Sequence, residues 1–408
     1  MDTNSLEATA RALVAPGKGI LAADESTGTI KKRFDTIGVD NVEENRQAYR
    51  DLLFTADGIG DYISGVILYD ETIRQVGLDG TPFPTVLESR GVIPGIKVDT
   101  GAKPLALADA GETVTEGLDG LRDRLAEYRS LGARFAKWRA TYLITDALPS
   151  QYAIDVNADA LARYAALCQE AGIVPIVEPE VMMEGSHTID RSAVVSAATL
   201  EALYHALYEQ RLHLPGTLLK PNMVLSGYDA SVQASVDDVA DQTLEVFSAH
   251  VPGAVPGIVF LSGGQTDEDA TAHLDAMNKR GPHPWELSFS YGRALQAAAL
   301  QAWRGDPANR RAAQAAFLHR AKFNSLARSG KYSPDMEQAA QPRPARRSCG
   351  HSSSASRRPE SASMVPSSAR SASGSVCSSA SPMTTMPPAR TGSPKRSGSS
   401  ASSPTTPG

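Results

Sequence analysis

A lysine closes a short apolar segment at 216–223, where Lys220 is followed directly by Pro221. The segment is too short for a helix and is bounded by Gly and Pro, which predicts a buried strand that ends in an amine. In a parallel sheet, side chains at the carboxyl ends of strands face the ligand crevice. A lone lysine there usually extends its amine to solvent, so the neighbouring strand ends decide whether Lys220 could be a nucleophile.

Charged side chains recur at the ends of the other predicted strands. Lys137 and Arg139 alternate along one strand, and Glu178 and Glu180 alternate along the next, so each pair shares one face. Three acids and four bases are expected at one mouth: Asp24, Lys97, Lys137, Arg139, Glu178, Glu180 and Lys220. Buried ion pairs seldom improve on an apolar core, so the cluster indicates function. A purely supporting ion pair between Glu180 and Lys137 stays open.

The elements that must position these residues alternate along the chain. Strands are predicted at 19–24, 65–70, 94–99, 135–142, 173–180, 216–223, 257–264 and 287–293. Helices are predicted at about 5–14, 43–56, 118–128, 157–171, 192–210, 236–250, 267–279 and 293–303. This order favours an α/β fold, a (β/α)8 TIM barrel with an N-terminal helical extension. An open doubly wound sheet is disfavoured, since the chain lacks a Gly-x-Gly-x-x-Gly after its first strand and a Walker A motif.

Two glycine-containing loops follow the seventh and eighth strands, where barrel enzymes often bind phosphate. Their backbone N–H groups, hydroxyls and one guanidinium suit an anion, and the residues concerned are Ser262, Gly263, Gly264, Ser290, Gly292 and Arg293. A second anion site is predicted from Lys97 with Ser26, Thr29 and Arg33. Two such sites on opposite sides of Lys220 imply a substrate phosphorylated at both ends.

The composition divides the chain near residue 340. Residues 341–408 hold nine Arg or Lys against Glu360, a net of +8, which leaves −14 for residues 1–340. The second part has 21 serines in 68 residues and no aromatic side chain, so it is predicted to be a low-complexity, disordered tail. A GC-rich gene read in a displaced frame is the favoured origin of this tail, and a genuine interaction tail is the alternative.

Cysteine and histidine usage gives no sign of a metal site or a disulfide framework. The three cysteines, Cys168, Cys349 and Cys377, form no CxxC pair, which fits a reducing cytoplasm. None of the eight histidines stands at a predicted strand end, and no two are spaced i, i+4. We therefore expect no metal or other cofactor, and we expect the histidines to be solvated. Neither a signal peptide nor a membrane span is predicted.

Residues 14–332 resemble class I fructose-1,6-bisphosphate aldolase, the Schiff-base family. The resemblance rests on the segments 15–26, 135–139, 176–180, 216–223 and 289–293. It implies an aldehyde-lyase that cleaves fructose 1,6-bisphosphate reversibly to dihydroxyacetone phosphate and glyceraldehyde 3-phosphate, in glycolysis or gluconeogenesis. It also implies a homotetramer, with a sugar bisphosphate as substrate and neither membrane nor nucleic acid as partner.

The resemblance assigns roles to individual residues. Lys220 is the Schiff-base nucleophile, Glu178 the general acid/base, and Asp24 the base acting on the C4 hydroxyl. Lys137 supports charge near the hydroxyls, and Glu180 orients Lys137. The side chains implied at the second phosphate are Ser26, Arg33, Arg46, Lys97 and Arg139, and at the first phosphate Ser262, Gly263, Gly292 and Arg293. Thr29 stands where the animal enzymes have serine, and it keeps the hydroxyl.

The chemistry needs these residue types whatever the family. Cleaving a bond β to a ketone leaves an electron pair, which an iminium on lysine accepts far better than a carbonyl does. The amine must first be neutral, so Lys137, Arg139 and partial burial are expected to lower the Lys220 pKa from about 10.4 toward roughly 7–8.

A phosphosugar isomerase and a nucleic-acid binder are the alternatives to an aldolase. A phosphosugar isomerase would need phosphate loops and a carboxylate, but no lysine within the cation cluster. A nucleic-acid binder would rely on the charge of the tail, which is dilute and lacks aromatic residues.

One feature departs from the family. Animal members end in a tyrosine that protonates the enamine at C3, whereas no tyrosine follows Tyr332 here. We therefore expect cleavage to survive and protonation at C3 to be slow.

Overall fold

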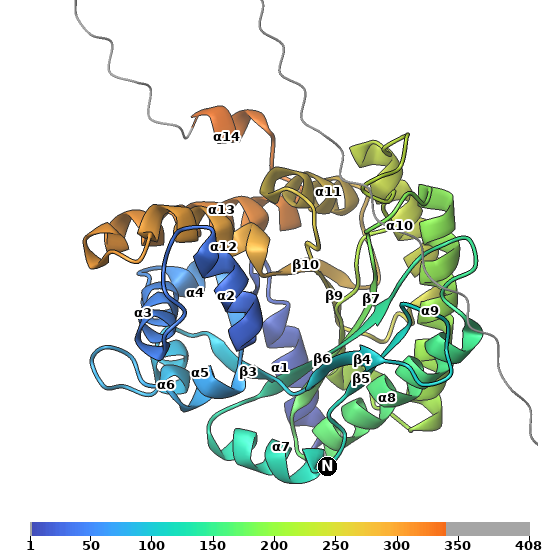
Figure 1. Ribbon diagram of the computed structural model, residues 1–408, viewed down its shortest axis with the longest axis horizontal. Helices are drawn as coiled ribbons and strands as arrows, with labels where there is room; N and C mark the ends of the chain where they lie inside the picture. The colour runs from blue at the N-terminus through green and yellow to red at the C-terminus, as the bar shows by residue number, and fades with distance from the viewer. Residues whose placement is uncertain (1, 340–408) are drawn as a thin grey trace, which may run out of the picture. The chain divides into compact units, whose positions relative to one another are not determined.

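The computed structural model describes residues 2–339, so the predictions for the tail at 341–408 lie outside the described residues. Eight parallel strands form a closed barrel in the order β1-β10-β9-β8-β7-β6-β3-β2, and helices surround these strands (Figure 1). The barrel strands are β1 (Gly19–Ala23), β2 (Ile63–Leu68), β3 (Ile93–Lys97), β6 (Phe135–Tyr142), β7 (Val174–Val181), β8 (Leu218–Leu219), β9 (Gly257–Phe260) and β10 (Glu286–Tyr291). The predicted (β/α)8 barrel is confirmed, and pairing of β1 with β10 excludes the open sheet.

Fourteen α-helices lie within the described residues 2–339. They are α1 (Thr3–Leu13), α2 (Thr27–Asp35), α3 (Glu43–Phe54), α4 (Ile59–Tyr62), α5 (Asp70–Arg74), α6 (Phe83–Glu88), α7 (Leu121–Ser130), α8 (Gln151–Glu170), α9 (Ile189–Glu209), α10 (Val236–His250), α11 (Asp267–Lys279), α12 (Arg293–Trp303), α13 (Arg310–Arg328) and α14 (Asp335–Ala339). Two 3-10 turns are η1 (Leu214–Gly216) and η2 (Pro307–Asn309). No helix of this part of the chain is long and apolar enough to cross a membrane.

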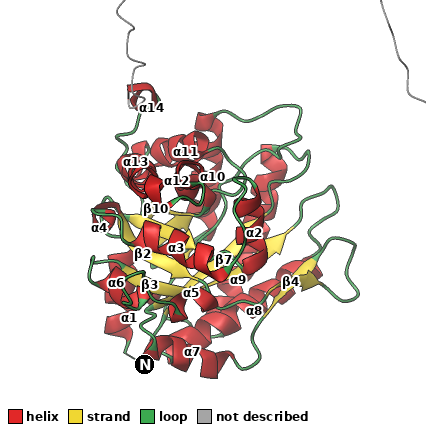
Figure 2. Ribbon diagram, turned by 60° about the vertical axis from the view of Figure 1, so that its left-hand side comes forward, coloured by secondary structure: helices red, strands yellow, loops and turns green. Residues whose placement is uncertain are grey.

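Several elements were missed in the sequence. The antiparallel hairpin of β4 (Gly101–Pro104) and β5 (Thr113–Glu116) forms a separate two-stranded sheet beside the barrel (Figure 2). The long helix α13 was also missed, because basic residues interrupt its apolar face. The predicted strand at 216–223 is shorter than expected: β8 has two residues, and Lys220 follows it with its backbone N–H donating to the Val177 carbonyl at 2.8 Å.

The barrel interior is filled by large side chains opposite glycines. A Cβ added at Gly95 would lie 2.3 Å from the Phe135 ring, and one at Gly65 would lie 3.0 Å from the same ring. One added at Gly19 would lie 2.6 Å from the ring of Phe289. Glycine is therefore required at these strand positions, because a residue without a Cβ atom leaves room for the aromatic rings.

Helix α1 covers the N-terminal end of the barrel. Leu6, Ala10 and Leu13 are buried in one apolar cluster with residues from β1, β2, β6, β7, β8 and β9, such as Ile176. The Ser64 hydroxyl of β2 donates to the Leu13 carbonyl at 2.5 Å. The predicted N-terminal helical extension is thus confirmed, and it seals the end of the barrel opposite the charged cluster.

Serine and threonine caps start several helices that follow barrel strands. Ser26 caps α2, Ser150 caps α8, Thr188 caps α9 and Thr266 caps α11, each by accepting a backbone N–H of the first turn. Ser235 and Asp238 form a capping box at α10. Such caps satisfy N–H groups that have no partner within the helix, so they define where each loop at the carboxyl ends of the strands stops.

Candidate active site

A cavity of about 400 Å³ opens at the carboxyl ends of the barrel strands. All the predicted site residues line it except Arg46. The lining residues among those predicted are Asp24, Ser26, Thr29, Arg33, Lys97, Lys137, Arg139, Glu178, Glu180, Lys220, Ser262, Gly263, Gly264, Ser290, Gly292 and Arg293. The prediction assumed that all strand ends meet at one edge of the barrel. The structure does bring these residues together there, although they lie up to 269 positions apart in the sequence.

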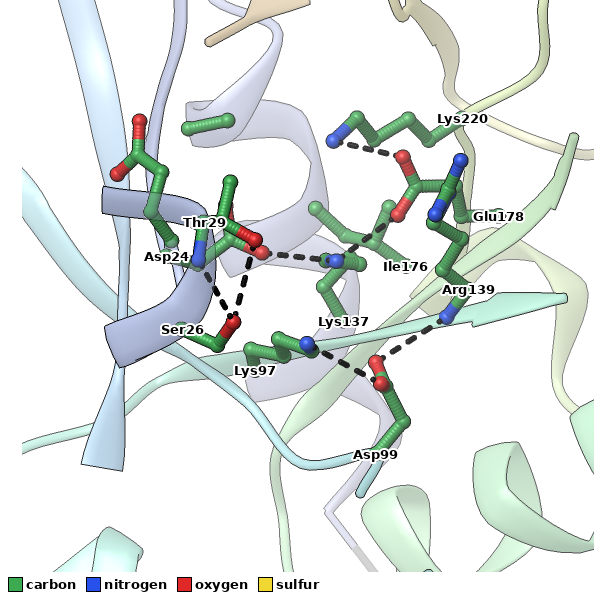
Figure 3. A network of polar contacts seen from close by, with 12 residues as sticks. Asp24, Ser26, Thr29, Lys97, Asp99, Lys137, Arg139, Ile176, Glu178 and Lys220 are labelled. Atoms are coloured by element: carbon green, nitrogen blue, oxygen red, sulfur yellow. Dashed lines mark hydrogen bonds and ion pairs between the residues drawn. The ribbon is translucent and has the colours of Figure 1, made fainter. Parts of the chain in front are cut away.

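Four side chains form a continuous chain of alternating charge across the cavity floor (Figure 3). Lys220 Nζ lies 2.9 Å from Glu178 Oε1, Glu178 Oε2 lies 3.0 Å from Lys137 Nζ, and Lys137 Nζ lies 2.8 Å from Asp24 Oδ2. Lys137, Glu178 and Lys220 are buried, and the Asp24 side chain is 14% exposed. Glu178 thus contacts both lysines, and Lys137 contacts both acids.

The charges of these four side chains stabilise one another. Burial alone would raise the pKa values of Asp24 and Glu178, but Lys137 and Lys220 outweigh it and hold both pKa values below their usual range. Burial would likewise lower the pKa of Lys137, and Asp24, Glu178 and Asp99 together raise it above its usual value. Both carboxylates are therefore ionised at neutral pH, and Lys137 remains a fixed cation.

Glu180 does not orient Lys137, contrary to the prediction. It forms an ion pair with Arg139 Nε instead. Glu178 and Glu180 do project from one face of β7, but Lys137 lies two residues deeper in β6 than Arg139. In the ladder, Arg139 pairs with Glu178 and Thr141 pairs with Glu180. The longer arginine reaches up to Glu180, and the lysine reaches Glu178.

Asp99 is a member of the site that the sequence reasoning did not select. Its Oδ1 lies 3.3 Å from Lys97 Nζ, and its Oδ2 accepts the Arg139 backbone N–H at 3.4 Å (Figure 3). The signal was present, because Asp99 follows Lys97 at the alternate position of the same predicted strand. Asp99 therefore fixes one of the cations expected at the second phosphate.

The start of helix α2, with its N-cap in the loop after β1, carries hydroxyls and a guanidinium to the same side. Ser26 Oγ lies 3.1 Å from Thr29 Oγ1. Glu25, which is buried, forms ion pairs with Arg33 and with Arg50 Nη2, the latter at 2.5 Å. This buried carboxylate orients Arg33 toward the cavity, and Glu25 was not among the predicted site residues, because only Asp24 stands at the predicted strand end.

Arg46 is placed elsewhere, contrary to the prediction. Its guanidinium pairs with Glu71 at 2.6 Å and does not line the cavity. Helix α3 directs the side chain toward α5, and the sequence contained no periodicity that would have revealed this partner.

The opposite side of the cavity is built from the loop after β9 and the start of α12. Gly263 has φ +53°, a left-handed conformation that favours glycine. Arg293 Nη2 donates to the carbonyls of Gly263 at 3.0 Å and Gln265 at 2.8 Å. Since Arg293 also begins α12, its loop and the positive end of a helix meet here. This arrangement suits an anion.

No group of three or more His, Cys, Asp or Glu within residues 2–339 could hold a metal ion. The prediction that the histidines are solvated is wrong for His273 of α11, which is buried. Its Nδ1 lies 2.7 Å from Gln265 Oε1. Burial lowers the pKa of His273 to about 4, so it is a neutral packing residue.

Comparison with known proteins identifies the family to which this geometry belongs. The model of the family described as fructose-bisphosphate aldolase class-I matches residues 5–346. The chain belongs to the class I fructose-bisphosphate aldolase family. Membership gives it the function of that family, a lyase reaction, and it agrees with the barrel and with a lysine at the centre of the charged cluster.

Individual relatives extend over most of the chain. "Probable fructose-bisphosphate aldolase class 1" of Xylella fastidiosa strain 9a5c is 58% identical over 333 residues, 81% of this chain and 99% of the relative. "Fructose-bisphosphate aldolase 4, cytosolic" of Arabidopsis thaliana is 53% identical over 336 residues, 82% and 85% of the two chains. A solved fructose-bisphosphate aldolase of Plasmodium falciparum, in complex with TRAP and a small-molecule inhibitor, is 49% identical with a TM-score of 0.80, over 81% of this chain and 95% of that one.

Proposed function

We propose that Lys220, Glu178 and Asp24 carry out the reversible cleavage of fructose 1,6-bisphosphate to dihydroxyacetone phosphate and glyceraldehyde 3-phosphate. The observation that carries this proposal is the single contact chain from Lys220 through Glu178 and Lys137 to Asp24. It supplies a nucleophile, an acid/base at that nucleophile, a fixed cation and a second base in one cavity.

The first half of the reaction takes place between Lys220 and Glu178. Glu178 first accepts a proton from the Lys220 ammonium, and the resulting neutral amine adds to the C2 ketone and forms a carbinolamine. Glu178 then returns the proton to the hydroxyl, which leaves as water and gives the iminium. The 2.9 Å separation of Lys220 Nζ and Glu178 Oε1 suits these short proton transfers.

The second half takes place at Asp24. Its carboxylate accepts the proton of the C4 hydroxyl, the C3–C4 bond breaks, and the bonding pair moves into the iminium to give an enamine. Glyceraldehyde 3-phosphate leaves as the aldehyde. Lys137, 2.8 Å from Asp24, stabilises negative charge near the hydroxyls during this step. A proton then adds to C3 of the enamine, and water hydrolyses the resulting iminium, which releases dihydroxyacetone phosphate and the Lys220 amine.

The two anion sites hold the ends of the substrate in this proposal. Ser262, Gly263, Gly264, Ser290, Gly292 and Arg293 bind the first phosphate, and Ser26, Thr29, Arg33, Lys97 and Arg139 bind the second. Arg46 is left out of the second set, because it pairs with Glu71. Cations and backbone N–H groups on both sides of Lys220 favour a bisphosphate over a neutral sugar.

The proposal further includes independence of metal and other cofactors, a cytoplasmic location, no nucleic-acid partner and a homo-oligomer, a tetramer by family resemblance. The residues that support metal independence are the lysine and carboxylates themselves, which provide the electron sink and the proton transfers. The Arabidopsis relative named as cytosolic supports the location. Light scattering on the purified full chain tests the oligomer, and a monomer would contradict it.

Trapping by borohydride tests the proposed nucleophile. We expect dihydroxyacetone phosphate plus borohydride to label wild type at Lys220 in the presence of EDTA, and Lys220→Met to abolish labelling. Lys103→Met, at an exposed position of the β4–β5 hairpin, is the matched control and should be labelled like wild type. Mass spectrometry of the peptides locates the label. Labelling that persists in Lys220→Met, or that requires a divalent ion, contradicts the proposal.

A further inference from the structure

Tyr228 lies against the glycine loop that is proposed to bind the first phosphate. A Cβ added at Gly264 would lie only 1.9 Å from the Tyr228 hydroxyl oxygen and 2.3 Å from Cζ. Tyr228 also lines the active-site cavity, together with Ser262 and Arg293. None of the sequence patterns pointed to this residue, because it stands in the irregular loop after Lys220.

Backbone hydrogen bonds hold the main chain around Tyr228. Its N–H donates to the Met183 carbonyl at 3.0 Å, and the N–H groups of the residues on either side donate to the loop after β7, at 2.9 Å each. A Cβ at Gly227 would lie 2.2 Å from the Gly185 carbonyl oxygen, so the two loops are in close contact there. The loop that carries Tyr228 is therefore held against the loop after the Glu178 strand.

The hydroxyl of Tyr228 has a weak acceptor. It donates to the thioether sulfur of Met183 at 3.5 Å, and a thioether accepts hydrogen bonds poorly. Burial raises the pKa of Tyr228, and so does Glu184, whereas Arg293 lowers it by less. The phenol is consequently protonated at neutral pH and can donate to a stronger acceptor.

Space beside Tyr228 allows a small change of its side chain. A second cavity of about 460 Å³ adjoins the first, and Tyr228 and Gly264 line both. The Tyr228 residue is 43% exposed. The side chain can therefore change its torsion angles slightly without a movement of the hydrogen-bonded backbone.

We propose that Tyr228 is a further substrate-binding residue, whose hydroxyl donates a hydrogen bond to the phosphate held by Ser262, Gly264 and Arg293. A phosphate oxygen replaces the Met183 sulfur as the acceptor, because an anionic oxygen is the stronger partner. The inference rests on the proposed function, and it makes the residue after Gly227 a determinant of preference for phosphorylated ketoses.

The test separates the phosphate from the rest of the ligand. In the full chain, Tyr228→Phe removes only the hydroxyl. We expect the half-saturating concentration of dihydroxyacetone phosphate in borohydride trapping to rise roughly tenfold, as for a lost hydrogen bond to a charged group. The inhibition constant of inorganic phosphate should rise similarly, whereas trapping of unphosphorylated dihydroxyacetone should be unaltered. Tyr208→Phe, 82% exposed on α9, is the matched control.

A second variant checks the contact itself. Gly264→Ala places a methyl group where the Tyr228 hydroxyl now lies, so the ring must move away. We expect Tyr228→Phe to weaken dihydroxyacetone phosphate much less in the Gly264→Ala background than alone, since the hydroxyl is already displaced.

Each outcome bears on one proposal. Unchanged half-saturation in Tyr228→Phe overturns the role of Tyr228, and so does an equal loss for dihydroxyacetone phosphate and dihydroxyacetone, which would indicate general distortion. Absence of trapping in wild type contradicts the proposed function instead. The two failures are therefore distinguishable.

Discussion

The two ends of the same barrel have opposite construction. At the N-terminal end, Leu6 and Leu13 of α1 pack on apolar side chains of the strands. Buried Arg328 there donates to the Val14 carbonyl at 2.5 Å, to the Lys18 carbonyl and to Glu286 at 2.7 Å. At the other end, the strands stop at a charged cavity.

The difference shows how each end uses polar groups. Arg328 donates to the Val14 carbonyl and shares the Lys18 carbonyl with the Ser288 hydroxyl, so its donors are used by the fold itself and its position requires no ligand. Lys137 and Lys220 instead form direct ion pairs with carboxylates in the lining of a cavity that a substrate can enter. Closed and apolar packing stabilises the fold, and open and charged packing provides the chemistry.

The largest expected effect is loss of turnover in Glu178→Gln. The amide keeps the shape but cannot transfer a proton to the carbinolamine, so kcat should fall by roughly 10²–10⁴. Affinity for inorganic phosphate should change little, because Glu178 does not belong to either proposed phosphate site. The matched control is Glu286→Gln at the closed end, which should keep kcat. Steady-state kinetics decide, and an unaltered kcat would remove Glu178 from this role.

Replacing a buried cation at each end should affect different properties. Lys137→Met leaves Asp24 and Glu178 facing each other without their common partner, so we expect a loss of about 3–5 kcal/mol in the free energy of unfolding, together with a large loss of kcat. Arg328→Met leaves the Val14 carbonyl unpaired, whereas the Lys18 carbonyl keeps the Ser288 hydroxyl. We expect a loss of about 1–3 kcal/mol in the free energy of unfolding for the unpaired group, with kcat retained. Urea denaturation and steady-state kinetics measure both. Equal losses of kcat in the two variants would contradict the division between the ends.

A smaller expected effect is the loss of packing in Leu13→Ala. Leu13 is fully buried at the closed end, so its truncation should lower the free energy of unfolding by about 2–5 kcal/mol. The midpoint of urea denaturation reports this change. Borohydride labelling of Lys220 should match wild type at a temperature where the variant is folded, whereas weaker labelling would show that the closed end controls the site.

Much of the site was predictable because the positions of strand ends can be recognised from local sequence patterns. A strand predicted from an apolar run bounded by Gly or Pro places its last residues at one edge, so Asp24, Lys97 and Glu178 could be grouped without knowing their contacts. The glycine loop at 262–264 was predictable for the same reason. Short elements such as the β4–β5 hairpin were not, because their few residues carry little periodicity.

The partners of each charge needed the tertiary structure. Glu180 was expected at Lys137 and lies at Arg139, because the register between β6 and β7 and the lengths of the side chains determine which atoms meet. Arg46 was expected at a phosphate and pairs with Glu71. Both errors concern distances between separate segments, about which spacing along the chain carries no information.

The sequence by itself determined the barrel and the set of charged residues at its mouth, since both follow from local patterns of apolar runs, glycines and strand ends; it also indicated the family, through the resemblance of five segments. Only the tertiary structure decided that Glu178 contacts two lysines, that Asp99 and Glu25 hold the neighbouring cations, and that Tyr228 lies against Gly264. The physical reason is that ion pairs and hydrogen bonds depend on separations of about 3 Å, and such separations are set by the packing of strands and loops that are distant in the sequence.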